Sequence, residues 1–153
     1  MSEKEQKIFD KCRQVAQSCA VFNLRKASRA LTQFYETALR PSGLRVTQFT
    51  LIVAVRLFGS TTISRLADTM VMDRTTLTRN LKLMEKKGFI TTIPGEDRRE
   101  RVVVLTEPGK ESLENALPLW EKAQREIVDA LGHRRFDEML ANLMATVSLV
   151  KAP

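Results

Sequence analysis

The sequence has few of the residues on which catalytic and metal sites depend. Its 153 residues include one histidine, His133, and two cysteines, Cys12 and Cys19. Zinc sites are usually built from three or four Cys and His ligands, so we expect no zinc site of that kind. His133 lies in a Gly-His-Arg-Arg junction between two expected helices, where a cap or surface position suits it. Because no nucleophile elbow, phosphate-binding loop or metal-ligand spacing appears either, we expect neither an enzyme nor a cofactor.

Long apolar runs are also missing. No segment reaches the roughly 20 apolar residues that a membrane-spanning helix needs. The first residues, MSEKEQKIFDKCRQ, lack the apolar region of a secretory signal. No stretch combines a strongly basic face with one rich in Trp or Phe, as a membrane-surface helix would. We therefore expect a cytoplasmic protein without a membrane partner.

Positive charge is abundant and unevenly distributed, with a formal net charge of +7. Residues 1–101 hold 19 Lys and Arg against 10 Asp and Glu, a balance of +9, whereas residues 102–153 hold 6 against 8, a balance of −2. A basic excess in one part of the chain is what a phosphate-binding surface requires. RNA is disfavoured because no exposed aromatic platform for stacking bases is visible, so double-stranded DNA is the expected partner.

Apolar residues at helical spacing predict two short helices joined by a tight corner. Thr62 is a suitable cap for the first helix, and Asp73 for the second. The corner, residues 70–72, contains no glycine, although helix-turn-helix corners often carry one. The expected inward stripes are Ile63, Leu66, Ala67 and Met70 on the first helix, and Leu77, Leu81 and Met84 on the second.

The second helix also carries small hydroxyls and long cations, which suit a major groove of DNA. Arg79 is the best candidate for a bidentate contact with guanine, and the threonines could bind phosphates or pack on thymine methyls. Ser64 and Arg65, at the start of the first helix, are expected to contact backbone phosphate. The residues of the second helix that we predict to contact DNA are Arg74, Thr75, Thr76, Thr78, Arg79 and Lys82.

A charged hairpin follows the two helices. After Gly88 the apolar period becomes strand-like over residues 89–93 and 102–105, with a Pro-Gly turn between them. At its tip we expect Arg99 to enter the minor groove, where negative potential is concentrated, with Arg98 as the alternative contact. Arg101 is expected to pair with Glu100 or Glu96. Residues 44–105 therefore read as a winged helix-turn-helix, in a mainly α fold with a small β-hairpin wing (α+β).

The two ends of the chain are expected to form long amphipathic helices, over residues 5–40 and 107–151. Pro41 and Gly43 end the first, Thr47 should cap a further helix over 48–58, and Pro118 should kink the helix that begins near 107. The apolar stripe of residues 8–22 favours a subunit interface, because a monomer of this size offers few surfaces to cover it.

These stripes predict one domain, residues 1–153, whose N- and C-terminal helices interdigitate with those of a second subunit. A two-fold dimer would present its recognition helices to successive major grooves, about 34–36 Å apart. The operator should then be an imperfect palindrome.

In these features the chain resembles the multiple antibiotic resistance regulator (MarR) family. The hallmark of that family is an Asp-x-Arg wing after a helix-turn-helix, which is Asp97-Arg98-Arg99 here. The resemblance covers nearly the whole chain and implies a homodimeric DNA-binding regulator, commonly a repressor that responds to a small molecule or an oxidant. It also implies that Asp97 positions the wing arginine. The lead-in segments that match are Asn23-Leu24-Arg25, Ser28-Arg29-Ala30-Leu31 and Leu44-x-Val46-Thr47-Gln48-Phe49.

What triggers the regulator is left open. Family members often bind aromatic acids or other small amphipathic molecules between the dimer core and the winged region, near Trp120 in this chain. The sequence identifies no effector residues. Oxidant-sensing members carry a reactive cysteine near the start of the first helix, which makes Cys19 or Cys12 the alternative sensor, although cysteines on apolar stripes are usually inert. A protein-binding winged helix is a further alternative, but it would expose apolar anchors on its recognition helix.

Overall fold

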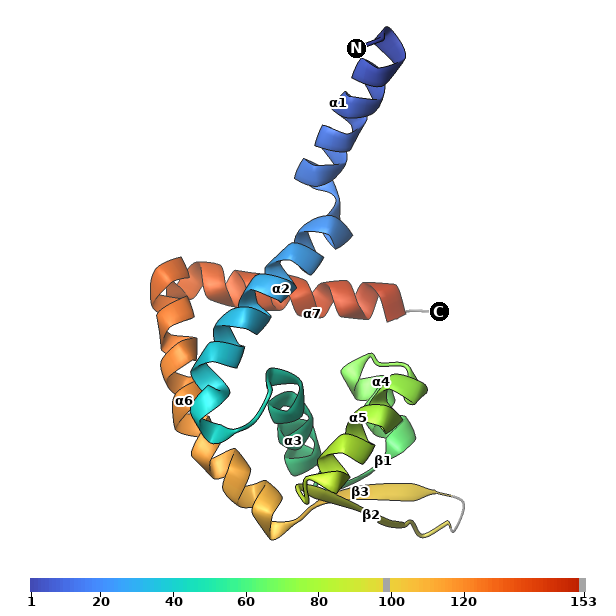
Figure 1. Ribbon diagram of the computed structural model, residues 1–153, viewed down its shortest axis with the longest axis vertical. Helices are drawn as coiled ribbons and strands as arrows, with labels where there is room; N and C mark the ends of the chain where they lie inside the picture. The colour runs from blue at the N-terminus through green and yellow to red at the C-terminus, as the bar shows by residue number, and fades with distance from the viewer. Residues whose placement is uncertain (98–99, 152–153) are drawn as a thin grey trace. The chain divides into compact units, whose positions relative to one another are not determined.

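The computed structural model describes residues 1–97 and 100–151, and these residues form a mostly helical chain with one small antiparallel sheet (Figure 1). The predicted fold class is therefore confirmed. The chain divides into two compact units, Met1–Thr37 and Ala38–Pro153, which are described separately. None of the described helices is long and apolar enough to cross a membrane.

The first unit contains a break that the sequence did not predict. Helix α1 spans Glu3–Ser18 and α2 spans Ala20–Leu39, so the single helix expected over 5–40 was wrong. Cys19 between them has extended backbone, with φ −74° and ψ 117°. The side-chain amide of Asn23 donates to the carbonyl oxygens of Ala16 at 3.3 Å and Cys19 at 3.0 Å. These bonds satisfy carbonyl groups at the break, which stabilises the interruption.

The second unit begins with a tight turn and a supporting helix. After the 3-10 helix η1, Arg40–Ser42, helix α3 spans Val46–Phe58. The expected cap at Thr47 was wrong, because Arg45 precedes the helix and Thr47 lies inside its first turn. The side-chain oxygen of Gln48 accepts from the Arg45 N–H at 3.1 Å, so the helix is capped from within. Gly59 ends α3 with φ 70°.

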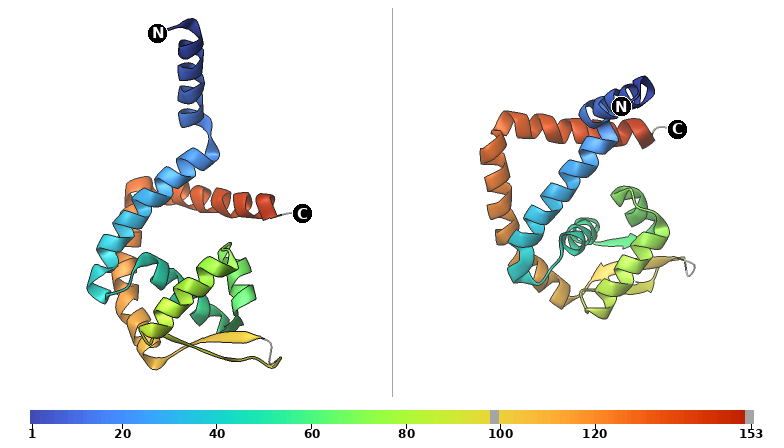
Figure 2. Two further views of the ribbon diagram at one scale, coloured as in Figure 1. Left: turned by 45° about the vertical axis from the view of Figure 1, so that its right-hand side comes forward. Right: turned by 45° about the horizontal axis from the view of Figure 1, so that its top comes forward.

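The helix-turn-helix and wing follow directly. Strand β1, Ser60–Thr62, leads into α4, Ile63–Met70, and α5, Arg74–Lys86. The wing strands are β2, Ile90–Pro94, and β3, Arg101–Leu105. All three strands pair antiparallel in the order β1-β3-β2, with Thr61 and Thr92 on either side of Val103. The sequence pattern did not predict β1, which has only three residues. Figure 2 shows the sheet beside α4 and α5 from two further directions.

One apolar core joins these elements. Its fully buried members come from α3, α4, α5 and the sheet, together with Leu39 at the end of α2 and Ala116 from α6. Burying each large apolar side chain contributes roughly 1.5–3 kcal/mol, so the core holds the helix-turn-helix firmly against α3. Helical spacing from Phe49 and Val53 predicts that Leu57 lies on the buried side of α3, but it is 78% exposed. The core-facing residues of the winged region are Ile52, Val55, Leu66, Leu77, Met84, Ile90 and Val103.

Two long helices complete the second unit. Helix α6 spans Glu107–Leu131, and the side chain of its cap, Thr106, accepts from the Gly109 N–H at 3.1 Å. The helix continues through Pro118 and bends along its course, as the proline predicts (Figure 1). Helix α7 spans His133–Lys151 and packs on α6. His133 is the exposed first residue of α7, in agreement with its expected cap or surface position.

Candidate nucleic-acid interface

The position of α5 depends first on its N-terminal cap. The Asp73 carboxylate accepts from the Thr76 N–H at 2.8 Å, which confirms the predicted cap. Two hydrogen bonds from Thr76 hold the pKa of Asp73 below its usual value. The larger effect comes from the Thr76 side chain, and the smaller one from its backbone N–H. The carboxylate therefore stays ionised and complements the positive end of the helix dipole.

The corner between α4 and α5 is closed without glycine. Val71 adopts the left-handed conformation, with φ 52° and ψ 44°, that glycine usually provides at a helix end. The Met72 N–H donates to the Ala67 carbonyl at 2.9 Å, and the Val71 N–H donates to the Asp68 carbonyl at 3.3 Å. This pair of bonds is a Schellman motif, which ends α4 and sets the direction in which α5 begins.

A shallow groove runs along the polar face of α5. Five of the six residues predicted on this helix line it together: Arg74, Thr75, Thr78, Arg79 and Lys82. Thr76, the sixth, is half-buried and does not line the groove. Lys86 and Leu83 complete the lining, and Leu83 was not among the predicted residues. Its position four residues after Arg79 was the signal that placed it on this face.

The cations of this groove are available to a partner. Arg74, Arg79 and Lys82 make no ion pair within the described part of the chain, and all three are exposed. The Thr78 hydroxyl donates to the Arg74 carbonyl at 2.7 Å, so its oxygen can only accept further bonds. A row of unpaired cations interleaved with hydroxyls can bind phosphates and read base edges.

The wing is tied to the end of α5 by hydrogen bonds. The Glu85 carboxylate accepts from the Thr92 N–H at 3.0 Å, which joins α5 to β2. Thr106 adds two bonds, because its hydroxyl donates to the Gly88 carbonyl and its N–H donates to the Phe89 carbonyl at 3.2 Å. The wing and the start of α6 are thus held in one orientation relative to α5.

At the wing tip the structure describes the flanks of the predicted contact residues. The Gly95 N–H donates to the Glu100 carbonyl at 3.0 Å, and the Glu100 N–H donates to the Asp97 carbonyl at 2.8 Å. Arg98 and Arg99 lie outside the described residues. Arg101 begins β3, is exposed and, among the residues described, pairs with neither Glu96 nor Glu100, so the expected ion pair was wrong.

Ser64 and Arg65 are exposed on the first turn of α4. The Arg65 N–H donates to the Thr62 hydroxyl oxygen at 3.2 Å, which confirms Thr62 as the cap. The Arg65 guanidinium lies 5.1 Å from the centre of the Phe58 ring, so its side chain rests on that ring. Arg65 would have to leave the ring to reach a phosphate.

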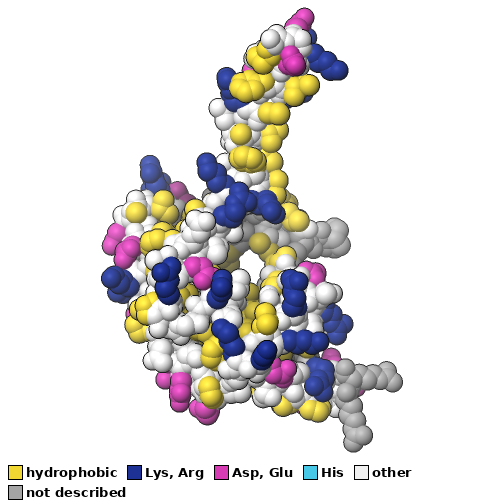
Figure 3. All heavy atoms as spheres, in the orientation of Figure 1, with side chains coloured by type: hydrophobic (Ala, Val, Ile, Leu, Met, Phe, Trp, Pro, Cys, Tyr) yellow, Lys and Arg dark blue, Asp and Glu magenta, His cyan; other side chains and the backbone are white. Residues whose placement is uncertain are grey.

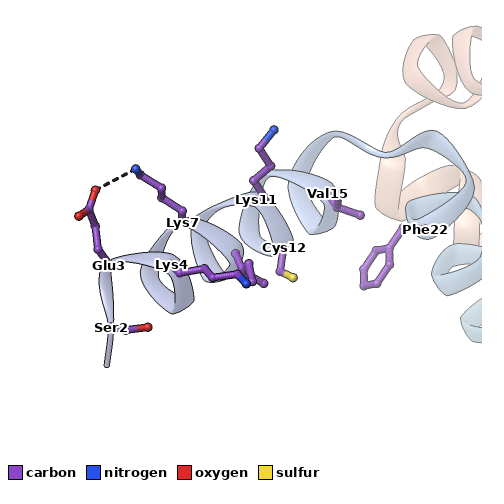
Figure 4. Close-up of a pocket in the computed structure, with 9 residues that line it drawn as sticks. Ser2, Glu3, Lys4, Lys7, Lys11, Cys12, Val15 and Phe22 are labelled. Atoms are coloured by element: carbon purple, nitrogen blue, oxygen red, sulfur yellow. Dashed lines mark ion pairs between the residues drawn. The ribbon is translucent and has the colours of Figure 1, made fainter.

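Both cysteines are free thiols in the first unit, with Cys12 exposed and Cys19 partly buried. Cys12, Val15 and Phe22 line one open apolar groove, flanked by lysines of α1 (Figure 4). Lys7, one of these lysines, pairs with Glu3 at 2.8 Å.

Figure 3 shows apolar side chains exposed along α1. In the second unit, α7 exposes Met144 and Leu149, the latter at 78%.

Residues 44–100, which contain the helix-turn-helix and most of the wing, match the model of the MarR family. The HTH-type transcriptional regulator SarZ of Staphylococcus epidermidis is 31% identical over 102 residues, 66% of this chain and 67% of that protein. The crystal structure of the Mycobacterium tuberculosis transcriptional regulator MosR in complex with DNA is 38% identical, with a TM-score of 0.77, and covers 88% of this chain and 100% of that one. The repressor CouR bound to a 23-mer DNA duplex has the same fold, with a TM-score of 0.78 at 20% identity over 88% of this chain and 95% of that one.

Proposed function

Because this chain belongs to the MarR family of DNA-binding transcriptional regulators, we propose that it is a repressor that binds a pseudo-palindromic operator as a homodimer. A small molecule releases it from the operator. The observation that carries this proposal is the unpaired cationic face of α5, where Arg74, Arg79 and Lys82 line one groove. A protein that binds an operator acts where the chromosome is, which places this one in the cytoplasm.

In this proposal each element of the winged region has its own task. Arg79 reads a guanine, while Arg74, Lys82 and the threonines bind phosphates and thymine methyls. As the sequence predicts, Arg99 enters the minor groove, and Arg98 is the alternative contact. Asp97 positions the arginine that makes this contact. Ser64 and Arg65 contact the backbone at the edge of the site.

A homodimer is supported by the apolar side chains that a single chain leaves in solvent. They occur on α1 and on the first turns of α2, and again on α7. Exposed apolar faces of helices usually mark an interface, and covering them would stabilise the two-fold arrangement that a palindromic operator needs. Light scattering after gel filtration should therefore give twice the 17.4 kDa mass of the chain.

The deciding experiment is salt-dependent binding of the purified protein to its own promoter and to a scrambled duplex. We expect a specificity gap of about 10³ or more and a steep loss of affinity as salt rises. Arg79→Ala and Arg99→Ala should narrow the gap, because each removes a contact worth roughly 1–3 kcal/mol. Arg125→Ala is the matched control, since Arg125 is an exposed cation of α6 outside the winged region.

Equal, weak binding to both duplexes would contradict the proposal for that promoter. Selection of bound fragments from the whole genome would then decide between an operator elsewhere and a winged domain that binds protein. Retention of the gap in Arg79→Ala would contradict the role given to that residue. A monomeric mass at the concentrations used would contradict the homodimer.

Oxidant sensing is the second candidate, favoured by the exposed thiol of Cys12. If it operates, peroxide should release the protein from operator DNA, and Cys12→Ser or Cys19→Ser should abolish the release. Unchanged DNA binding after peroxide would exclude this mechanism and leave the small molecule as the trigger.

A further inference from the structure

One leucine of α5 lies outside the apolar core. Leu83 is 55% exposed, whereas the other three apolar residues of this helix, Leu77, Leu81 and Met84, are at most 3% exposed. Those three hold α5 against the rest of the winged region, and Leu83 is not part of the core that they join. Core packing therefore does not require a leucine at this position.

Leu83 belongs instead to the cationic groove of α5. Side chains four residues apart lie on the same face of a helix, so the residues that line the groove form two rows. One row holds Thr75, Arg79 and Leu83. The other row contributes three of the four cations among the described lining residues, and it consists of Arg74, Thr78, Lys82 and Lys86. The second row is suited to phosphates, which leaves the first row to face the edges of the bases.

The first row offers side chains that distinguish bases from one another. A guanidinium such as that of Arg79 binds guanine through two hydrogen bonds, and an apolar side chain packs on the C5-methyl group of thymine. Leu83 is the only apolar residue among the described residues that line the groove. Against a phosphate or an amino group, a leucine would remove water without supplying a hydrogen bond. Thymine is therefore the base that suits Leu83 best.

The same surface disfavours a protein as the partner of Leu83. A helix that binds protein presents several apolar anchors, at spacings such as i, i+3 and i+7. Helix α5 exposes no large apolar residue other than Leu83, which lies among cations and hydroxyls. DNA matches this combination, because its major groove presents thymine methyl groups between two rows of phosphates.

We propose that Leu83 is a specificity-determining residue that contacts the methyl group of one thymine in each half-site of the operator. The inference rests on the proposed function, because it names a base that the same face of α5 recognises. Leu83 follows Arg79 by four residues, or about 6 Å along the helix axis. Since base pairs are about 3.4 Å apart, the thymine lies one or two base pairs from the guanine assigned to Arg79. Thr75 lies one turn before Arg79, so its contacts fall on the other side of that guanine.

The test removes only the methyl group that Leu83 contacts. In the operator that promoter binding or fragment selection defines, each thymine is replaced by deoxyuridine, one position at a time and in both half-sites. Fluorescence anisotropy at fixed salt then gives the affinity of each labelled duplex. Burying one methyl group changes an equilibrium constant about fourfold, so the wild-type protein should lose at least that much affinity at one thymine position. Leu83→Ala should bind the thymine operator more weakly than the wild type, and should bind the two duplexes equally to within about twofold.

Three further variants separate contact with the methyl group from other effects. Leu83→Met keeps an apolar side chain of similar size and should keep the response to deoxyuridine. Leu83→Lys adds a cation, so it should lose this response and make binding more dependent on salt. Leu57→Ala is the matched control at an exposed leucine of α3 that does not line the groove, and it should change neither the affinity nor the response. Circular dichroism should confirm that all the variants fold.

The response to deoxyuridine decides whether Leu83 recognises a thymine. A response that Leu83→Ala retains would assign the thymine to another residue and refute the proposal. Specific binding of the wild-type protein to an operator that shows no such response would also refute it, while the proposed function would stand. Absence of specific binding to any genomic fragment would overturn the proposed function, and the inference with it.

Discussion

Replacement of Gly109 by alanine tests how closely α6 is joined to the recognition helix. A Cβ atom at position 109 would lie 1.9 Å from the Phe89 carbonyl oxygen and 2.9 Å from its carbonyl carbon. Both are backbone atoms of the turn between α5 and β2, so no side chain can rotate away to make room. By helix propensity alone, alanine should instead stabilise this first-turn position by up to about 1 kcal/mol.

The size of the expected destabilisation follows from the movement of α6 that the new methyl group requires. Restoring an ordinary contact requires a shift of roughly 1 Å or more between α6 and the turn, and overpacking of this kind costs about 1–3 kcal/mol. The shift also strains the bonds from Thr106 to the carbonyls of Gly88 and Phe89, each worth about 1 kcal/mol. After the gain in propensity is subtracted, we expect a net destabilisation of about 3 kcal/mol.

Urea unfolding at a fixed protein concentration, followed by Trp120 fluorescence and circular dichroism, measures this effect. With a slope of roughly 1–3 kcal/mol per molar urea, a loss of about 3 kcal/mol should lower the midpoint by about 1–3 M. Glu111→Ala, at an exposed position two residues further along α6, should change stability by no more than about 0.5 kcal/mol. A midpoint for Gly109→Ala equal to or above that of the wild type would refute the close approach of α6 to the turn.

Three further predictions concern the winged region. Val71→Gly should raise the free energy of unfolding by about 1 kcal/mol in urea titrations, because valine is strained at φ 52°; a loss of stability would argue against that conformation. Asp73 has a lowered pKa, so its capping contribution is complete above the ordinary value of 3.8 and is lost as pH falls through the lower folded pKa. Urea unfolding should therefore show wild-type stability declining relative to Asp73→Asn below about pH 4, and a pH-independent difference would contradict the cap. Glu85→Ala should weaken operator binding about fivefold by releasing Thr92 of the wing, whereas Glu85→Gln keeps an acceptor and should stay near wild type; equal effects would contradict the tether.

Two helix caps and one apolar stripe, which depend on neighbours within four residues, were predicted correctly. The predicted caps Thr62 and Asp73 each accept a hydrogen bond from a backbone N–H three residues ahead, so residue type and position suffice to recognise them. The inward stripe of α5 follows in the same way from helical spacing, and its three members are buried. The break at Cys19 was missed because it depends on the side chain of Asn23, which reads in the sequence as an ordinary helix position.

By itself, then, the sequence determined the helix-turn-helix and the wing that follows it, the caps Thr62 and Asp73, and the gathering of cations on one face of α5. Only the tertiary structure decided that residues 60–62 form a strand, because the partner of that strand lies about forty residues later in β3. The same holds for the approach of Gly109 to Phe89. Local hydrogen bonds and periodicity depend on short segments of chain, so they can be recognised in the sequence. A close backbone contact depends on how distant segments pack, and it is fixed only when the core forms.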